Sequence, residues 1–191
     1  MSPAFKKNFP NLLTISRGFL IVLISIVFFS GWKYRFLVAL LLFILAILTD
    51  ILDGKLARKW KVKSDYGVVF DSLFDKILTI NMYLLLIPHN LIHTGVFVAL
   101  VIRDLLIDGI KNYSLSRGIP ISARKSGKSK MVAQGAMIIF ALLLLTFPGN
   151  FLFYGCLVIS AIAALFFSYF SGILYVVDWI YREDDRPAKK K

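Results

Sequence analysis

Four aspartates within residues 50–75 have the type and spacing expected of a metal-dependent reaction centre. Residues three or four positions apart share one face of a helix, so the first two and the last two each form a stripe. A short turn between the two helices predicts that the stripes face each other. Four such carboxylates stay ionised together only beside cations, and oxygen ligands favour Mg²⁺ or Mn²⁺. The predicted metal ligands are Asp50, Asp53, Asp71 and Asp75.

An alternative is that these aspartates make unrelated salt bridges or lie on solvated helix faces. Apolar runs of membrane length flank them on both sides. Ionisable side chains are rare in such surroundings and usually serve a function there. The sequence therefore favours the metal site over scattered surface charges.

Composition indicates a membrane protein. Of the 191 residues 58% are hydrophobic, and the formal net charge is +12. The apolar share exceeds that of soluble domains. The basic residues cluster beside the apolar runs, which points to anionic lipid and phosphate and not to nucleic acid.

The chain divides into apolar segments of about 20 residues, the length that crosses a bilayer. We predict an all-α, polytopic fold in which six transmembrane helices follow a short N-terminal interfacial segment. Residues 1–181 are expected to form a single catalytic domain, with 182–191 as a charged tail. The first segment is expected to stay in place, because no cleavage site of the signal-peptide kind is evident. The six segments are 12–32, 35–58, 67–87, 91–113, 130–148 and 151–180.

The distribution of basic residues predicts the orientation. The N-terminal region, the 55–66 turn, the 111–130 connection and the tail carry three, five, six and five basic residues, which is 19 of the 23. All four regions lie on one side of the predicted bundle. Because basic loops stay inside, both termini and the aspartates are expected on the cytoplasmic face of the membrane.

The aspartates are part of a longer pattern, D-x2-D-G-x2-A-R-x8-G-x3-D-x3-D, which residues 50–75 match at all eight fixed positions. This pattern resembles the signature of the CDP-alcohol phosphatidyltransferases, and the similarity extends through most of the chain. It implies that an alcohol attacks the β-phosphorus of a CDP-linked lipid such as CDP-diacylglycerol and that CMP leaves. It also implies two metal ions, about 3.5–4 Å apart in sites of this kind, and a homodimer.

The resemblance assigns roles within the signature. Asp50, Asp53 and Asp71 hold the metals and the diphosphate, and Asp75 lies near the second metal and acts as base for the acceptor hydroxyl. Four further residues complete the CDP-binding set. Arg58 offers a fork suited to two diphosphate oxygens, although it could equally be a cytoplasmic anchor. The small residues let the nucleotide approach the backbone, and they also suit simple helix packing; they are Gly54, Ala57 and Gly67.

Weaker similarities point to one branch of the family, the bacterial phosphatidylglycerophosphate synthases. The stretches NFPNLLTISRG, DSLFDK, RDLLIDGIK and GKSKMVAQ resemble that branch, with Ser72, Asp104 and Met131 among the departures. The similarity implies glycerol 3-phosphate as acceptor. The groups expected to bind its phosphate are Arg103, Lys111, Lys128 and Lys130.

Alternatives remain at this stage for these basic residues and for the function. Arg103 could be satisfied by Asp104 or Asp108, because buried charges are usually paired; Lys128 and Lys130 could be surface anchors. The acceptor could be phosphatidylglycerol, as in a cardiolipin synthase, or serine or an inositol phosphate. From another class, intramembrane carboxylates could serve an ion transporter, although such sites usually lie near the bilayer midplane.

Overall fold

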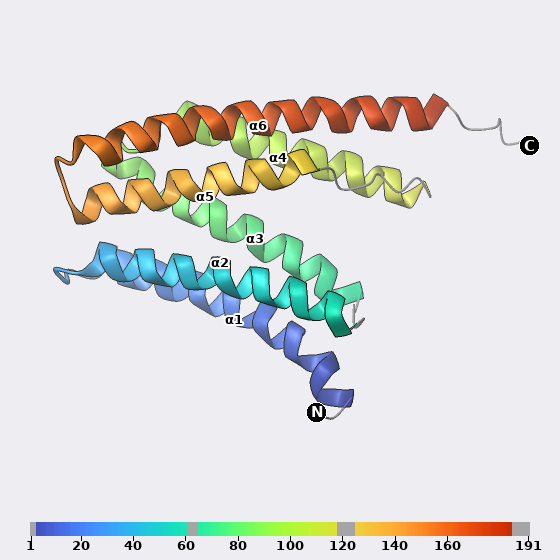
Figure 1. The fold of residues 1–191 in the computed structure, drawn as a ribbon, viewed down its shortest axis with the longest axis horizontal. Helices are drawn as coiled ribbons and strands as arrows, with labels where there is room; N and C mark the ends of the chain where they lie inside the picture. The colour runs from blue at the N-terminus through green and yellow to red at the C-terminus, as the bar shows by residue number, and fades with distance from the viewer. Residues whose placement is uncertain (1–2, 61–64, 118–124, 185–191) are drawn as a thin grey trace, which may run out of the picture. The chain divides into compact units, whose positions relative to one another are not determined.

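The computed structural model describes residues 3–60, 65–117 and 125–184, and side chains over 15–52, 55, 73–117 and 128–181. Within these ranges the chain is helical, as predicted (Figure 1). Long apolar runs favour helices in a bilayer because a helix satisfies its own backbone hydrogen bonds. The helices are α1 Pro3–Phe29, α2 Arg35–Trp60, α3 Asp65–Leu86, the short 3₁₀ helix η1 Ile87–His89, α4 Thr94–Ser116, α5 Lys125–Thr146 and α6 Phe151–Asp184.

Three of these helices are long and apolar enough over their described residues to cross a membrane. The apolar spans are Arg35–Leu52, Lys128–Thr146 and Phe151–Tyr181, and Ile15–Phe29 is a shorter apolar stretch. Helices α3 and α4 have similar lengths of 22 and 23 residues. Their apolar character is interrupted by charged residues, of which Asp71, Asp75, Arg103 and Lys111 belong to the predicted site.

The N-terminal region is helical and continuous with the first apolar segment. Helix α1 begins at Pro3 and continues without interruption into the apolar stretch. Proline within a helix removes one hydrogen bond and usually bends the helix instead of ending it when neighbouring turns hold. Figure 1 shows that α1 bends in its N-terminal part, the part that contains Pro10.

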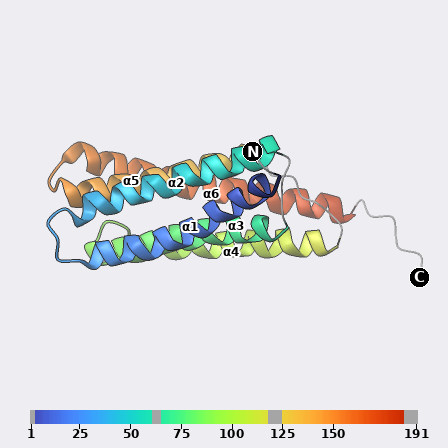
Figure 2. The ribbon, with the colours of Figure 1, turned by 90° about the horizontal axis from the view of Figure 1, so that it is seen from below.

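The chain forms two compact units. The first comprises residues 1–91 and 141–150, and the second comprises 92–140 and 151–191. In the first unit α1 and α2 run antiparallel (Figures 1 and 2), and α1 also packs against α3. The buried residues follow helical spacing: Ile21, Ile24 and Phe28 on α1, Ala39, Phe43 and Ala46 on α2, Leu78, Met82 and Leu86 on α3.

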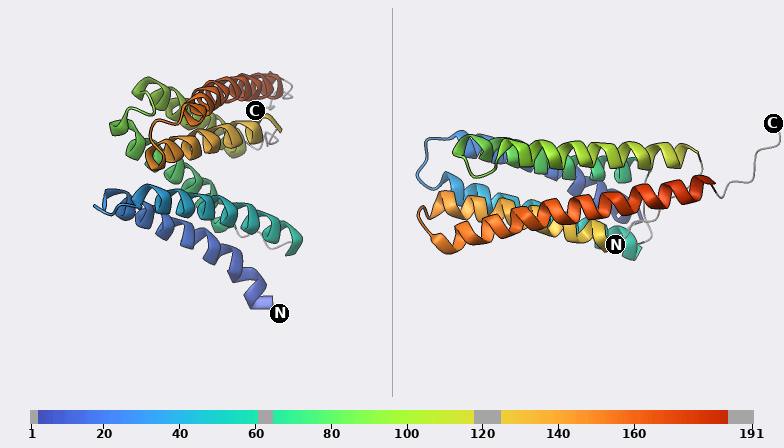
Figure 3. Two further views of the ribbon diagram at one scale, coloured as in Figure 1. Left: turned by 60° about the vertical axis from the view of Figure 1, so that its left-hand side comes forward. Right: turned by 90° about the horizontal axis from the view of Figure 1, so that it is seen from above.

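In the second unit α4 packs against α6, and the two helices run in the same direction (Figure 3). The buried face of α6 has small residues at intervals of three and four. Such residues let helix backbones approach closely in membranes. The buried positions of this face are Leu157, Ser160, Ala164, Ser168, Ser171, Gly172 and Tyr175.

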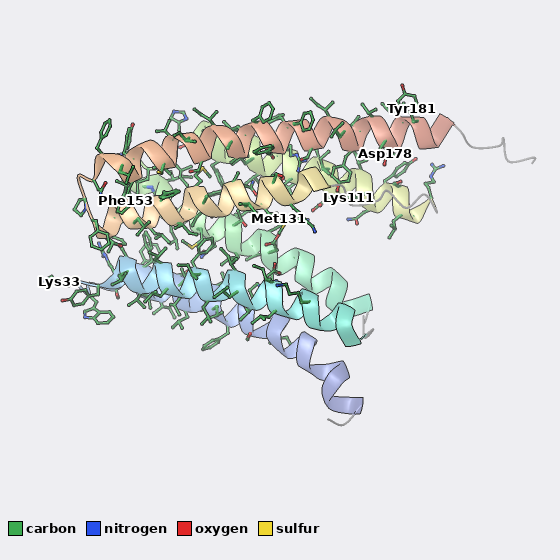
Figure 4. All side chains as sticks on the ribbon, in the orientation of Figure 1. Lys33, Lys111, Met131, Phe153, Asp178 and Tyr181 are labelled. Atoms are coloured by element: carbon green, nitrogen blue, oxygen red, sulfur yellow. The ribbon has the colours of Figure 1, made fainter. Side chains whose placement is uncertain are left out.

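Large apolar side chains are exposed along the outer faces of the helices. On α2 they recur at helical spacing at Leu41, Leu45, Leu48 and Leu52, each at least 45% exposed. Figure 4 shows the labelled Tyr181 directed away from α6, and this side chain is also exposed. Soluble proteins rarely expose contiguous apolar faces of this kind, so these faces fit contact with lipid.

Candidate active site

The first signature aspartate is bound by a buried arginine from α1. Arg17 Nη2 lies 2.8 Å from Asp50 Oδ1, and the two side chains are 1% and 28% exposed. Arg17 continues the buried stripe of α1 below Ile21, and Asp50 continues that of α2 beyond Ala46. The ion pair is therefore the polar end of the apolar interface between these two helices.

The next residue of α1 contacts the other signature helix. A Cβ atom added to Gly18 would lie 2.8 Å from Phe74 Cε1, closer than carbon atoms pack. Glycine thus lets α1 approach α3 next to the last signature aspartate, Asp75, which is partly buried. Neighbouring residues of α1 contact both signature helices.

The expectation that the carboxylate stripes of α2 and α3 face each other stays a prediction, because the side chains of Asp53 and Asp71 lie outside the described set. Over the described residues, both helices make their extensive backbone contacts with α1. The reason is packing: Gly18 removes the bulk that would keep α3 away from α1. The short turn between α2 and α3 constrains only how far apart their ends lie.

Six predicted residues lie on the described helices, with side chains outside the described set. Asp53, Gly54, Ala57 and Arg58 are on α2, one to two turns beyond Asp50, and Gly67 and Asp71 are on α3 before Asp75. Among the side chains that are described, no group of three metal-ligating residues occurs. The metal-ligand assignments of Asp50, Asp53, Asp71 and Asp75 therefore stay predictions.

The residues fit a hard divalent cation by their chemistry. The signature offers carboxylate oxygens, the ligands that Mg²⁺ and Mn²⁺ prefer. The described member Asp50 is paired with Arg17, and its side chain is 28% exposed, so solvent reaches it. A carboxylate that is both ionised and accessible is what metal binding requires.

Arg17 was absent from the predicted site, although the sequence contains a signal for it. It falls inside the apolar segment 12–32 and is one of the three basic residues of the N-terminal region. An arginine within an apolar segment is costly unless it is paired. The cost of burying Arg17 predicts that an acidic residue pairs with it, but the sequence does not say which aspartate does so.

A second polar cluster lies in the other unit, among α4, α5 and α6. Arg103 Nη1 donates to Asp104 Oδ1 at 2.9 Å, and Lys130 Nζ lies 2.7 Å from both oxygens of Asp104. Arg103 Nη2 also donates to the hydroxyl of Ser171. Arg103 is only 9% exposed, and its Nε has no hydrogen-bond partner among the described residues. The pairing with Asp104 considered above is thus present, and two cations share this carboxylate.

The remaining predicted acceptor residues lie apart from that cluster. Lys111, two turns after Arg103 on α4, places its Nζ 4.6 Å from the centre of the Tyr175 ring on α6. Figure 4 shows Lys111 beside the part of α6 that carries Asp178. Lys128 is exposed near the start of α5, and no described contact joins it to Arg103.

Comparison with known proteins identifies the family. The model of the CDP-alcohol phosphatidyltransferase family matches residues 7–179. The chain belongs to this family. Its relatives include proteins named CDP-diacylglycerol–glycerol-3-phosphate 3-phosphatidyltransferase. That of Mycoplasma genitalium is 30% identical over 156 residues, covering 72% of this chain and 66% of the relative; that of Rickettsia typhi is 28% identical over 148 residues, covering 78% and 82%.

Membership of the CDP-alcohol phosphatidyltransferase family confirms the predicted family and enzyme class. Enzymes of this family generally depend on divalent metal. Membership also removes the ground for the ion-transporter alternative. The chain spans 66% of the length of the Mycoplasma genitalium relative and 76% of that of Salmonella choleraesuis, which is 29% identical over 141 residues and covers 72% of this chain.

Proposed function

We propose that this chain transfers a phosphatidyl group from CDP-diacylglycerol to glycerol 3-phosphate, giving phosphatidylglycerophosphate and CMP. The complete signature supports the donor half of this proposal. The observation that carries the acceptor half is the buried Arg103, which shares Asp104 with Lys130 and keeps one N–H without a partner among the described residues. The relatives that bear the corresponding name support the same acceptor.

In the proposed reaction, the acceptor hydroxyl oxygen forms a bond to the lipid-linked phosphorus of CDP-diacylglycerol. The bond from that phosphorus to the bridging oxygen breaks, and CMP leaves with that oxygen. Asp75 takes the hydroxyl proton. Asp50, Asp53, Asp71 and Asp75 would hold Mg²⁺ or Mn²⁺, two per site, which when bound neutralises charge on the phosphates.

Further residues are proposed to bind the substrates. Arg58 binds the diphosphate as a fork, with Gly54, Ala57 and Gly67 making room for the nucleotide. Arg17 holds Asp50 in place through the ion pair. The phosphate of the acceptor is bound by Arg103 and Lys130, with Lys111 and Lys128 contributing positive charge.

The setting proposed is a bacterial cell membrane. Six transmembrane helices form one domain over residues 1–181, followed by the tail 182–191. Both termini and the active site lie on the cytoplasmic side, which agrees with the positions of the basic residues. Glycerol 3-phosphate then enters from the cytoplasm, while the acyl chains of the donor stay in the bilayer. A homodimer is proposed on family grounds alone.

The test is release of CMP from CDP-diacylglycerol by the purified protein in detergent. An acceptor panel compares glycerol 3-phosphate, phosphatidylglycerol, serine and inositol phosphate, each with Mg²⁺, with Mn²⁺ and with a chelator. We expect metal-dependent release with glycerol 3-phosphate and loss of release in Asp71→Asn. Release with phosphatidylglycerol alone would instead support a cardiolipin synthase.

Charge reversal at Arg103 tests the acceptor assignment separately. Arg103→Glu should raise the KM for glycerol 3-phosphate strongly and leave the KM for CDP-diacylglycerol unchanged. An unchanged acceptor KM would remove Arg103 from the site while leaving the reaction class intact.

A further inference from the structure

We propose that the face of α6 formed by Ser171, Gly172 and Tyr175 positions the basic side chains of α4 and thereby sets the affinity for the acceptor phosphate. Nothing in the signature or its flanking motifs involves these residues. The inference rests on the proposed acceptor site and extends it to a helix that carries none of its basic groups.

Ser171 orients the guanidinium of Arg103 through a directed hydrogen bond. Its hydroxyl donates to the carbonyl of Ser168 at 3.0 Å, one turn back on α6. With its proton so committed, the oxygen presents its lone pairs to Arg103 Nη2, which donates to it. Asp104 holds Nη1 in the same way from α4 itself. Two acceptors from two helices therefore fix the plane of the guanidinium.

Gly172 makes the space that this orientation needs. A Cβ atom added there would lie 3.0 Å from Arg103 Nε and 3.5 Å from Nη2. Nε is the one N–H-bearing atom of Arg103 that is buried without a partner among the described residues. The Nε edge of the guanidinium, which has no hydrogen-bond partner among the described residues, thus lies against a residue without a side chain.

Tyr175 supports the second basic residue one turn further along α6. Its ring lies below the Lys111 ammonium at 4.6 Å, and the tyrosine is buried. A cation over an aromatic face is attracted to it and held without losing its charge. Tyr175 follows Ser171 by four positions and Gly172 by three, the spacings of neighbours on a helix surface, so this part of α6 contacts Arg103 and Lys111 together.

The decisive variant is Gly172→Ala, measured with glycerol 3-phosphate as the varied substrate. The added methyl group must displace the Arg103 guanidinium, and since that is the end of a flexible side chain, the protein should remain folded. We expect the KM for glycerol 3-phosphate to rise about three- to tenfold, as misplaced binding groups cost rate and affinity. The kcat and the KM for CDP-diacylglycerol should stay at their wild-type values. The matched control is Gly155→Ala on the same helix, where an added Cβ meets nothing within 4 Å.

Two further pairs of variants separate positioning from structural roles. Ser171→Ala should raise the acceptor KM about tenfold, the effect of losing a hydrogen bond to a charged group. Ser171→Thr, which keeps the hydroxyl, should have the wild-type acceptor KM. Tyr175→Leu should raise the same KM, whereas Tyr175→Phe keeps the ring and should not.

The outcomes distinguish this inference from the function on which it rests. If Arg103→Glu raises the acceptor KM and Gly172→Ala and Ser171→Ala leave it unchanged, the α6 inference is wrong and the acceptor site stands. An equal rise in the KM for both substrates would also overturn it, as would a rise in the acceptor KM in Gly155→Ala equal to that in Gly172→Ala. If the wild-type protein does not use glycerol 3-phosphate, the proposed function itself fails first.

Discussion

The two polar clusters of this protein use the same parts in different arrangements. Each has a buried arginine paired with a carboxylate, and each has a glycine at which an added Cβ atom would meet a side chain of another helix. In the first, Arg17 and Gly18 are consecutive on α1 and contact two different helices. In the second, Arg103 is on α4, and Gly172 on α6 makes room for it.

The two arginines also differ in their exposure and in their partners. Arg17 is 1% exposed in its side chain and reaches the more exposed Asp50, so its charge supports a residue of the signature. Arg103 shares its carboxylate with Lys130, and its guanidinium packs against Gly172. The first arginine thus pairs with one acid of the signature, and the second is the one that we propose binds the phosphate of the acceptor. Four variants test this contrast.

Removal of the proposed base should have the largest effect. Asp75→Asn keeps the shape of the side chain and removes its capacity to take a proton, so we expect kcat to fall about 10²–10⁴-fold. The measurement is CMP release at saturating substrates and Mg²⁺. Asp178→Asn, which neutralises an aspartate on α6 without a proposed role, is the control and should keep its kcat. Retention of most of the activity by Asp75→Asn would exclude it as the base.

Breaking the α1 ion pair should mainly reduce stability. Arg17→Met leaves Asp50 charged in a largely apolar interface, and we expect the free energy of unfolding to fall by about 2–3 kcal/mol, below the range for fully buried pairs because Asp50 is partly exposed. Unfolding by sodium dodecyl sulfate in mixed micelles measures this change. Adding Asp50→Asn should recover part of the loss. Additive effects of the two substitutions would show that the pair is not coupled.

A conservative change at the second arginine should alter substrate affinity instead. Arg103→Lys keeps the charge but replaces the planar fork, whose two terminal nitrogens bond Asp104 and Ser171, by a single ammonium, so we expect the KM for glycerol 3-phosphate to rise about tenfold. Steady-state CMP release measures it. Arg35→Lys, at an arginine that donates to the carbonyl of Ser30, is the matched control. A loss of stability without a change in KM would make Arg103 a structural residue like Arg17.

The smallest effect is expected at the glycine of α1. Gly18→Ala places a methyl group 2.8 Å from the Phe74 ring. The resulting shift should lower the free energy of unfolding by about 1 kcal/mol, the low end for overpacking. Gly31→Ala, where nothing lies within 4 Å, is the control, and Phe74→Leu combined with Gly18→Ala should restore stability. A stabilising Gly18→Ala would mean that α1 and α3 can separate without cost.

Much of the fold follows from local sequence. Apolar runs of bilayer length form the helices, and the observed ends lie within a few residues of most predicted segments. The N-terminal stretch is helical and continuous with the first apolar segment, because Pro10 is accommodated inside α1; its expected place at the membrane surface stays a prediction. A single proline leaves a break and a continuous helix both open until the surrounding turns are known.

The sequence by itself determined the family and its chemistry, because eight fixed positions within 26 residues depend only on local spacing. Only the tertiary structure decided which groups complete each cluster. Arg17 meets Asp50 across 33 positions, and Arg103 meets Ser171 across 68. Such pairs depend on how helices rotate and approach one another, and Gly18 and Gly172 control that approach through the absence of a side chain, which spacing along one helix does not encode.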